Sequence, residues 1–136
     1  MFFWKRRPAL NAGPALTPTE RCRAMGQAVA AAAGRPWAEL GPRQQSALAT
    51  FLVGMVSAVG MKAELPQDET VALAREALRE AFGLVPNAAN RAVRTAIDAT
   101  RTGQPPGLRA QIDRGIDAEA LHGAGDTAAL TRLVVE

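Results

Sequence analysis

The feature that most constrains the fold is an uncharged stretch at positions 44–61, QQSALATFLVGMVSAVGM, between Arg43 and Lys62. A membrane-spanning helix needs about 20 predominantly apolar residues, whereas this stretch opens with two glutamines and also contains serine, threonine and glycine. Its large side chains recur at helical spacing, and its small ones form a second stripe. We therefore interpret the stretch as the buried central helix of a helical domain, in preference to a membrane span.

The composition favours helices throughout. Hydrophobic residues make up 48% of the chain, but only 4% are aromatic and tyrosine is absent, so alanine must fill much of the core. Alanine is the strongest helix former and permits close helix packing. At 136 residues the chain has the size of one domain. We predict an all-α fold: a single compact bundle of about five to six helices around the central apolar helix at about 43–61.

Local signals predict where the helices begin and end. Thr17 as N-cap, Pro18 and Glu20 form a capping box at the start of the first helix, and Gly34 is expected to end it. Two further helices are expected at about 66–82 and 86–102. A fifth helix is expected to start beyond Gly107, and a last short helix is expected after Asp126, which serves as its N-cap. Residues 17–136 are thus predicted to form one helical domain, preceded at 1–16 by a basic, aromatic arm and a leader rich in proline and glycine.

The net charge of +3 equals the charge of the N-terminal arm, so the predicted domain is neutral overall. Its charge is uneven, because residues 115–136 contain four acids and only one arginine: Asp117, Glu119, Asp126, Glu136 and Arg132. A nucleic-acid-binding protein usually presents a concentrated basic face with aromatic residues for base stacking, and neither is evident. This favours a basic protein partner for the acidic end over nucleic acid.

The N-terminal arm has two interpretations. It combines apolar and basic residues: Phe2, Phe3, Trp4, Lys5, Arg6 and Arg7. Such a cluster suits peripheral contact with an anionic membrane, but one short cluster binds weakly, which favours an arm whose aromatic side chains pack on the domain. The apolar residues precede the basic ones and no apolar signal segment follows, so we expect a cytoplasmic protein.

Residues suited to catalysis are few. One histidine, one cysteine and no tyrosine leave little for acid-base, nucleophilic or metal chemistry, which needs several such groups in one place. Cys22 is interpreted as a packed thiol, in preference to one activated near a helix start. His122 follows Asp113 and Asp117 only loosely along the helix, which makes a metal site the weaker alternative to surface charges. We expect no enzymatic activity, cofactor, metal or small-molecule substrate.

The segment around residue 113 is the least explained by packing. Ile112 and Ile116 are expected to point inward. This leaves the charged side chains of Asp113, Arg114 and Asp117 to pair locally or to meet a partner. The partner-binding surface is therefore predicted to comprise Asp113, Arg114, Asp117, Glu119 and Asp126.

Several segments together resemble a known class of protein. These are the WKRR leader, the LTPTE helix start, ALATFLVGMVSAVG, AREALREAFG and RGIDAEALHGAGDTAAL. In this order they resemble small all-α immunity proteins of bacterial polymorphic-toxin and secretion-system loci, over most of residues 17–133. The adjacent Asp113 and Arg114 are similar to an acid-arginine signature in one such group.

The resemblance implies a non-enzymatic protein that binds a cognate toxin or effector domain and neutralises it. The alternative is a helical regulatory or adaptor domain that contacts nucleic acid or an anionic membrane through its basic elements.

Overall fold

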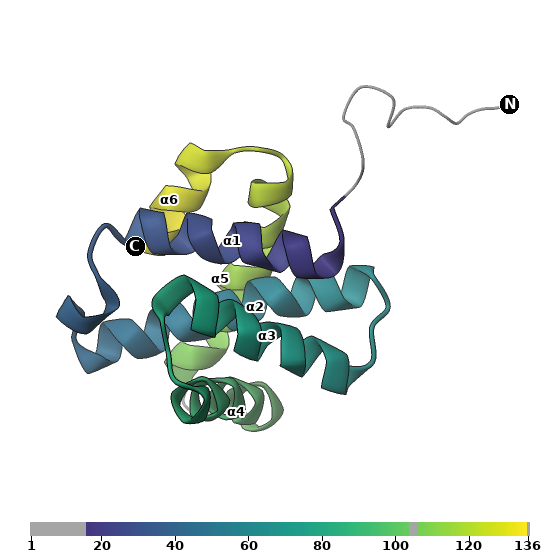
Figure 1. The fold of residues 1–136 in the computed structure, drawn as a ribbon, viewed down its shortest axis with the longest axis horizontal. Coiled ribbons are helices and arrows are strands. Elements are labelled where there is room, and N and C mark those ends of the chain that lie inside the picture. The colour runs from purple at the N-terminus through teal and green to yellow at the C-terminus, as the bar shows by residue number, and fades with distance from the viewer. Residues whose placement is uncertain (1–15, 104–105, 136) are drawn as a thin grey trace, which may run out of the picture.

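A computed structural model describes residues 16–103 and 106–135 of the chain. Within these residues it contains six α-helices, one short 3-10 helix and no strand (Figure 1). The elements are α1 (Pro18–Ala33), η2 (Trp37–Glu39), α2 (Pro42–Lys62), α3 (Gln67–Phe82), α4 (Pro86–Thr102), α5 (Pro106–Gly123) and α6 (Thr127–Val135). The predicted all-α bundle is confirmed. The N-terminal arm and its aromatic residues lie outside the described ranges.

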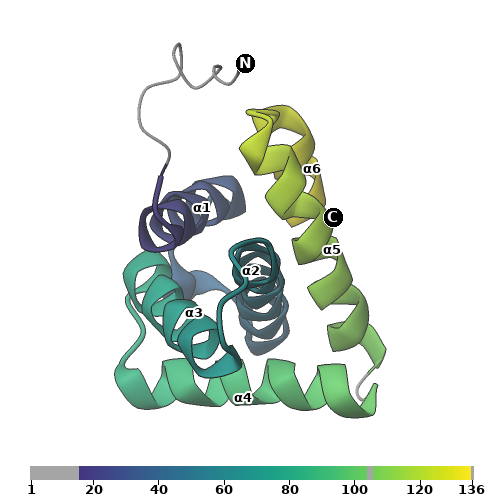
Figure 2. The ribbon, with the colours of Figure 1, turned by 90° about the vertical axis from the view of Figure 1, so that its right-hand side faces the viewer.

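Helix α2 is the centre of the bundle. It contacts α1, α3, α4 and α5, and Figure 2 shows it nearly end-on with these four helices around it. Every residue from Leu48 to Val56 is buried, which means that α2 is covered on all sides over that length. The central apolar helix is thus confirmed at the predicted position.

Within the described ranges, α2 is also the one helix that is long and apolar enough to cross a membrane. In its most apolar window, 67% of the residues are buried inside the protein. The core helix of a globular domain passes the same test of length and composition, and the burial of α2 is that of a core helix.

The ends of the helices follow the local signals. The backbone amide of Glu20 donates to Thr17 Oγ1 over 3.1 Å, and the Thr17 amide donates to Glu20 Oε1 over 2.9 Å, which completes the predicted capping box. Gly34 ends α1 with a left-handed φ of 74°. Helix α5 begins at Pro106, earlier than the predicted start beyond Gly107, because proline is well suited to the first position of a helix.

Helices α2 and α5 approach each other closely at two glycines. A Cβ atom on Gly115 would lie 2.1 Å from the carbonyl oxygen of Phe51 and 3.0 Å from the Cα of Gly54. A Cβ atom on Gly54 would lie 2.3 Å from the carbonyl oxygen of Ile112. Real Cβ atoms do not approach other atoms so closely, so the two backbones can touch only because both positions lack a side chain.

Replacement of Gly115 by alanine should therefore destabilise the fold. We expect Gly115→Ala to lower the free energy of unfolding by about 1–3 kcal/mol or more, because backbone atoms of α2 occupy the space of the new methyl group. Gly107→Ala is the matched control, since Gly107 also lies in α5 but its Cβ would meet no atom within 4 Å. In urea unfolding, the free energy of unfolding of Gly107→Ala should equal or exceed that of the parent, because alanine favours helix more than glycine does. Equal stability of Gly115→Ala and the parent would contradict the close contact.

Candidate functional site

The five residues predicted to bind a partner lie on α5 and in the turn after it, but they do not share one surface. Asp113, Asp117 and Asp126 are exposed, and Arg114 is half-buried. Glu119 is only 4% exposed. The part of the predicted set that faces solvent is therefore the three aspartates.

Asp113 and Asp117 lie on the outer face of α5, opposite the buried residues Ile112, Gly115 and Ala118. The Oδ1 atom of Asp113 is 4.0 Å from the Nε atom of Arg109, one helical turn earlier, and both side chains are exposed, so this pair is weak. Asp117 has no ion pair or hydrogen bond to another residue in the described ranges. This face of α5 thus presents carboxylates with little local neutralisation.

Arg114 turns away from its acidic neighbours. Its Nη2 atom donates a hydrogen bond to the carbonyl oxygen of Leu133 near the end of α6. Carbonyl groups in the last turn of a helix lack partners within the helix, so Arg114 satisfies one of them and ties α6 to α5. Asp126 begins α6, as predicted: its Oδ1 atom accepts a hydrogen bond from the amide of Ala129 over 3.1 Å.

The buried Glu119 is the centre of a charge cluster that the sequence did not reveal, in which Arg21 is partly buried and Lys62 is exposed. Its Oε2 atom is 2.8 Å from Nη2 of Arg21 on α1, and its Oε1 atom is 2.6 Å from Nζ of Lys62 at the end of α2. Nη2 of Arg21 also donates to the backbone carbonyl of Glu119 over 3.0 Å. The cluster joins α1, α2 and α5, and it corrects the expectation that Glu119 belongs to an exposed acidic surface.

The position of Glu119 along α5 explains its burial. It follows the buried Ile112 by seven residues and the buried Gly115 by four, so it lies on the helix face that packs against the core. The sequence does contain a signal for this burial, because Glu119 is a charged residue on an otherwise apolar stripe of the helix. Such a residue indicates a partner of opposite charge, since an unpaired buried carboxylate is very costly.

His122 completes the cluster. Its Nδ1 atom is 2.7 Å from Nη1 of Arg21. A guanidinium group can only donate, so Nδ1 must accept and the imidazole is neutral in this arrangement. Burial lowers the pKa of His122, the charge of Arg21 lowers it further, and Glu119 opposes the change. In the described ranges no three His, Cys, Asp or Glu side chains converge as metal ligands.

Cys22 is packed in the core beside Arg21. It is 2% exposed, and burial raises the pKa of its thiol to about 11, with a smaller opposing effect of Arg21. A thiol with such a pKa is almost entirely protonated at neutral pH and is a poor nucleophile. The structure therefore agrees with the packed thiol and not with the activated one.

No family model, curated protein or solved structure matches this chain.

Loss of the Glu119 carboxylate should destabilise the domain. We expect Glu119→Ala to lower the free energy of unfolding by about 3 kcal/mol, because it leaves Arg21 partly buried without its counter-charge. The control is Glu80→Ala, which removes an exposed pair with Arg23 at 3.0 Å and should cost about 1 kcal/mol at most. Chemical denaturation followed by circular dichroism measures both. Equal losses for the two variants would show that the buried cluster contributes no more than a surface pair.

The lowered pKa of His122 predicts a pH dependence of stability. Well above the ordinary pKa of about 6.5, the imidazole is neutral in both the folded and the unfolded protein, so it has no effect on stability. As the pH falls below that value, the unfolded protein binds a proton that the folded protein resists, and stability decreases until the folded-state pKa is reached. We expect His122→Asn, which keeps an acceptor for Arg21, to reduce this decrease between about pH 7 and 5. Parallel curves of unfolding free energy against pH for parent and variant would contradict the lowered pKa of His122.

Proposed function

We propose that this chain is a non-enzymatic immunity protein that binds a cognate bacterial toxin domain and neutralises it. The proposal rests on the family resemblance of the sequence and on one structural observation. Helix α5 presents Asp113 and Asp117 to solvent while its opposite side is held against α2 at Gly115.

The close contact with α2 makes α5 a suitable scaffold for recognition. At Gly54 and Gly115 the backbones of the two helices touch directly, with no side chain between them at that point. A surface that is already ordered loses less conformational entropy when a partner binds, so more of the contact energy remains as affinity. The position of the two aspartates is therefore fixed before the partner arrives.

The charge of this face fits a basic partner. Asp113 and Asp117 are one helical turn apart, and Asp126 adds a third exposed carboxylate in the turn after α5. Toxins that act on nucleic acids need basic surfaces to hold phosphates. Exposed carboxylates would steer such a toxin toward α5 and compete with its substrate, mainly through association rate and specificity.

The state of the reactive side chains supports a binding role over a catalytic one. The thiol of Cys22 is buried with a raised pKa. The Nδ1 atom of His122 accepts a hydrogen bond from Arg21. Both groups are thus used in packing, whereas general acid-base or nucleophilic catalysis needs them directed at a substrate.

Charge reversal on α5 tests the proposal. Asp113 and Asp117 are both replaced by lysine, and binding to the product of the neighbouring gene, which the proposal predicts to be the toxin, is measured by calorimetry. We expect the complex to weaken by roughly 2 kcal/mol or more, because like charges would then face each other across the interface. The stability of the free protein should change little, since both side chains are exposed.

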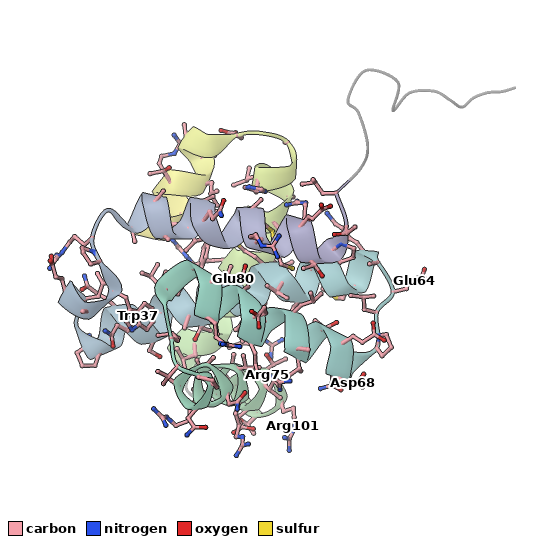
Figure 3. The ribbon with its side chains drawn as sticks, in the orientation of Figure 1. Trp37, Glu64, Asp68, Arg75, Glu80 and Arg101 are labelled. Carbon is pink, nitrogen blue, oxygen red and sulfur yellow. The ribbon has the colours of Figure 1, made fainter. Side chains whose placement is uncertain are left out.

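The matched control is the double variant Glu39→Lys and Glu64→Lys. It changes the net charge by the same amount at exposed positions near the two ends of α2, and Glu64 is visible at the edge of the molecule in Figure 3. Its affinity for the toxin should stay close to that of the parent. If both double variants bind and protect as the parent does, α5 is not the interface, and the exposed arginines of α4, which are Arg91, Arg94 and Arg101, become the next candidate.

A further inference from the structure

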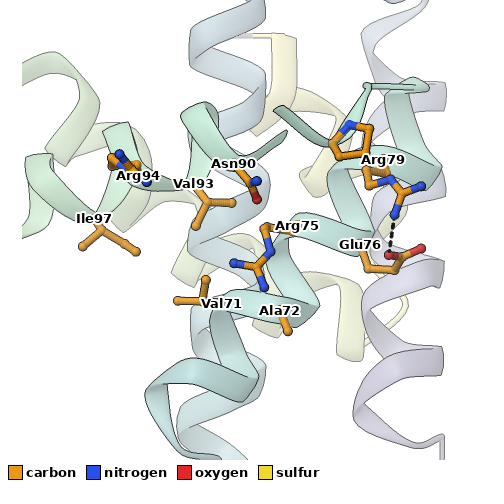
Figure 4. Close-up of a pocket in the computed structure, with 10 residues that line it drawn as sticks. Val71, Ala72, Arg75, Glu76, Arg79, Asn90, Val93, Arg94 and Ile97 are labelled. Carbon is orange, nitrogen blue, oxygen red and sulfur yellow. Dashed lines mark hydrogen bonds and ion pairs between the residues drawn. The ribbon is translucent and has the colours of Figure 1, made fainter. Parts of the chain in front are cut away.

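A groove between α3 and α4 forms a second surface of distinct chemistry. It is open to solvent and has a volume of about 700 Å³, and side chains of both helices line it (Figure 4). We call it the arginine groove. Its charged and polar lining residues are Arg75, Glu76 and Arg79 of α3 and Asn90 and Arg94 of α4.

The charge of the arginine groove is not neutralised locally. Glu76 pairs with Arg79 over 3.3 Å, as Figure 4 shows. Arg75 and Arg94 have no ion pair or hydrogen bond to any other residue within the described ranges. Arg75 and Arg101 both lie on the α3–α4 side of the molecule in Figure 3. The groove thus presents two guanidinium groups that are available to an anionic ligand.

The base of the arginine groove is apolar. Val71, Val93 and Ile97 line it, and the same three residues also line a second cavity of about 200 Å³. This second cavity reaches Val53 of α2 and Ile112 of α5 at the core. Next to the arginines the protein therefore offers a place for an apolar side chain.

We propose that the arginine groove binds a segment of a partner protein in which an apolar side chain is flanked by carboxylates. Guanidinium groups bind carboxylates through paired hydrogen bonds, which gives Arg75 and Arg94 a specific counterpart. The apolar base would take the side chain between those carboxylates, and a volume of about 700 Å³ lies in the range of small binding sites. This site goes beyond the proposed function, because it uses neither Asp113 nor Asp117.

The lining favours a protein segment over other anions. Among the residues that the structure describes, no aromatic side chain lines the groove to stack on a nucleic-acid base. Phosphate-backbone binding would also leave the apolar base unused. The chain's own arm is a poor occupant, because Lys5, Arg6 and Arg7 would be repelled by the arginines.

A displayed library of random peptides is the probe. Selection on the full-length protein should enrich peptides in which one or two large apolar residues lie between Asp or Glu residues. An enriched peptide is then synthesised, and its affinity is measured by fluorescence anisotropy at two salt concentrations, where tighter binding at low salt is expected.

The test variant is Arg75→Glu with Arg94→Glu. We expect it to bind the selected peptide about tenfold more weakly or worse, and to select peptides rich in lysine and arginine instead. The control, Arg43→Glu with Arg132→Glu, makes the same charge change at exposed positions outside the groove and should stay within about twofold of the parent. If the glutamate variant loses helicity, Arg75→Gln with Arg94→Gln replaces it. This variant should show a smaller loss of affinity for the peptide.

Three outcomes would overturn the proposal. The first is a selection that yields no enriched peptide, or peptides without acidic residues. The second is displacement of the peptide by a single-stranded oligonucleotide at lower concentration than by the peptide itself, which would assign the groove to nucleic acid. The third is concentration-dependent self-association of the parent that the Arg75 and Arg94 variant abolishes, which would assign it to a second copy. None of these outcomes bears on toxin binding by α5, so the two proposals fail independently.

Discussion

The contact of α2 and α5 at Gly54 and Gly115 is the constraint on which the rest of the structure depends. Because backbone atoms touch there, α5 has no freedom to shift or rotate without a clash. The contact buries Ile112 and Ala118 against the core and by the same geometry turns Asp113 and Asp117 outward. The inner packing and the outer chemistry of α5 thus have one cause, and α5 also contacts α4 and α6.

Polar contacts then fix how the outer helices attach to this central pair. Glu119 binds Arg21 and Lys62, and Arg114 binds a carbonyl of α6, so α1 and α6 are both tied to α5 by charged side chains. A buried ion pair adds little net stability compared with apolar packing, but breaking it is costly. We infer that the cluster chiefly specifies orientation: an alternative packing of α1 would remove Arg21 from the buried carboxylate of Glu119 and leave it paired with Lys62 alone.

The helices were predictable from the sequence because their signals are local. Thr17 and Glu20 are three residues apart, and Gly34 marks the end of α1 by its own backbone preference. The partners of the charged residues were not predictable in this way, since Arg21 and Glu119 are 98 positions apart and meet only after the bundle has formed. Glu64 shows the same limit: it adopts a left-handed φ of 56°, where glycine would be expected, because the turn between α2 and α3 requires that conformation.

The two proposed surfaces have opposite charge and lie on one helical bundle. The outer face of α5 carries Asp113 and Asp117, whereas the arginine groove carries Arg75 and Arg94. A basic partner is attracted by the first surface and repelled by the second, and an acidic segment behaves in the opposite way. If both proposals hold, charge alone would sort the two partners before any close contact forms. A domain that is neutral as a whole can discriminate in this manner because its charges are separated in space, and the fixed packing of α2 against α5 keeps them separated.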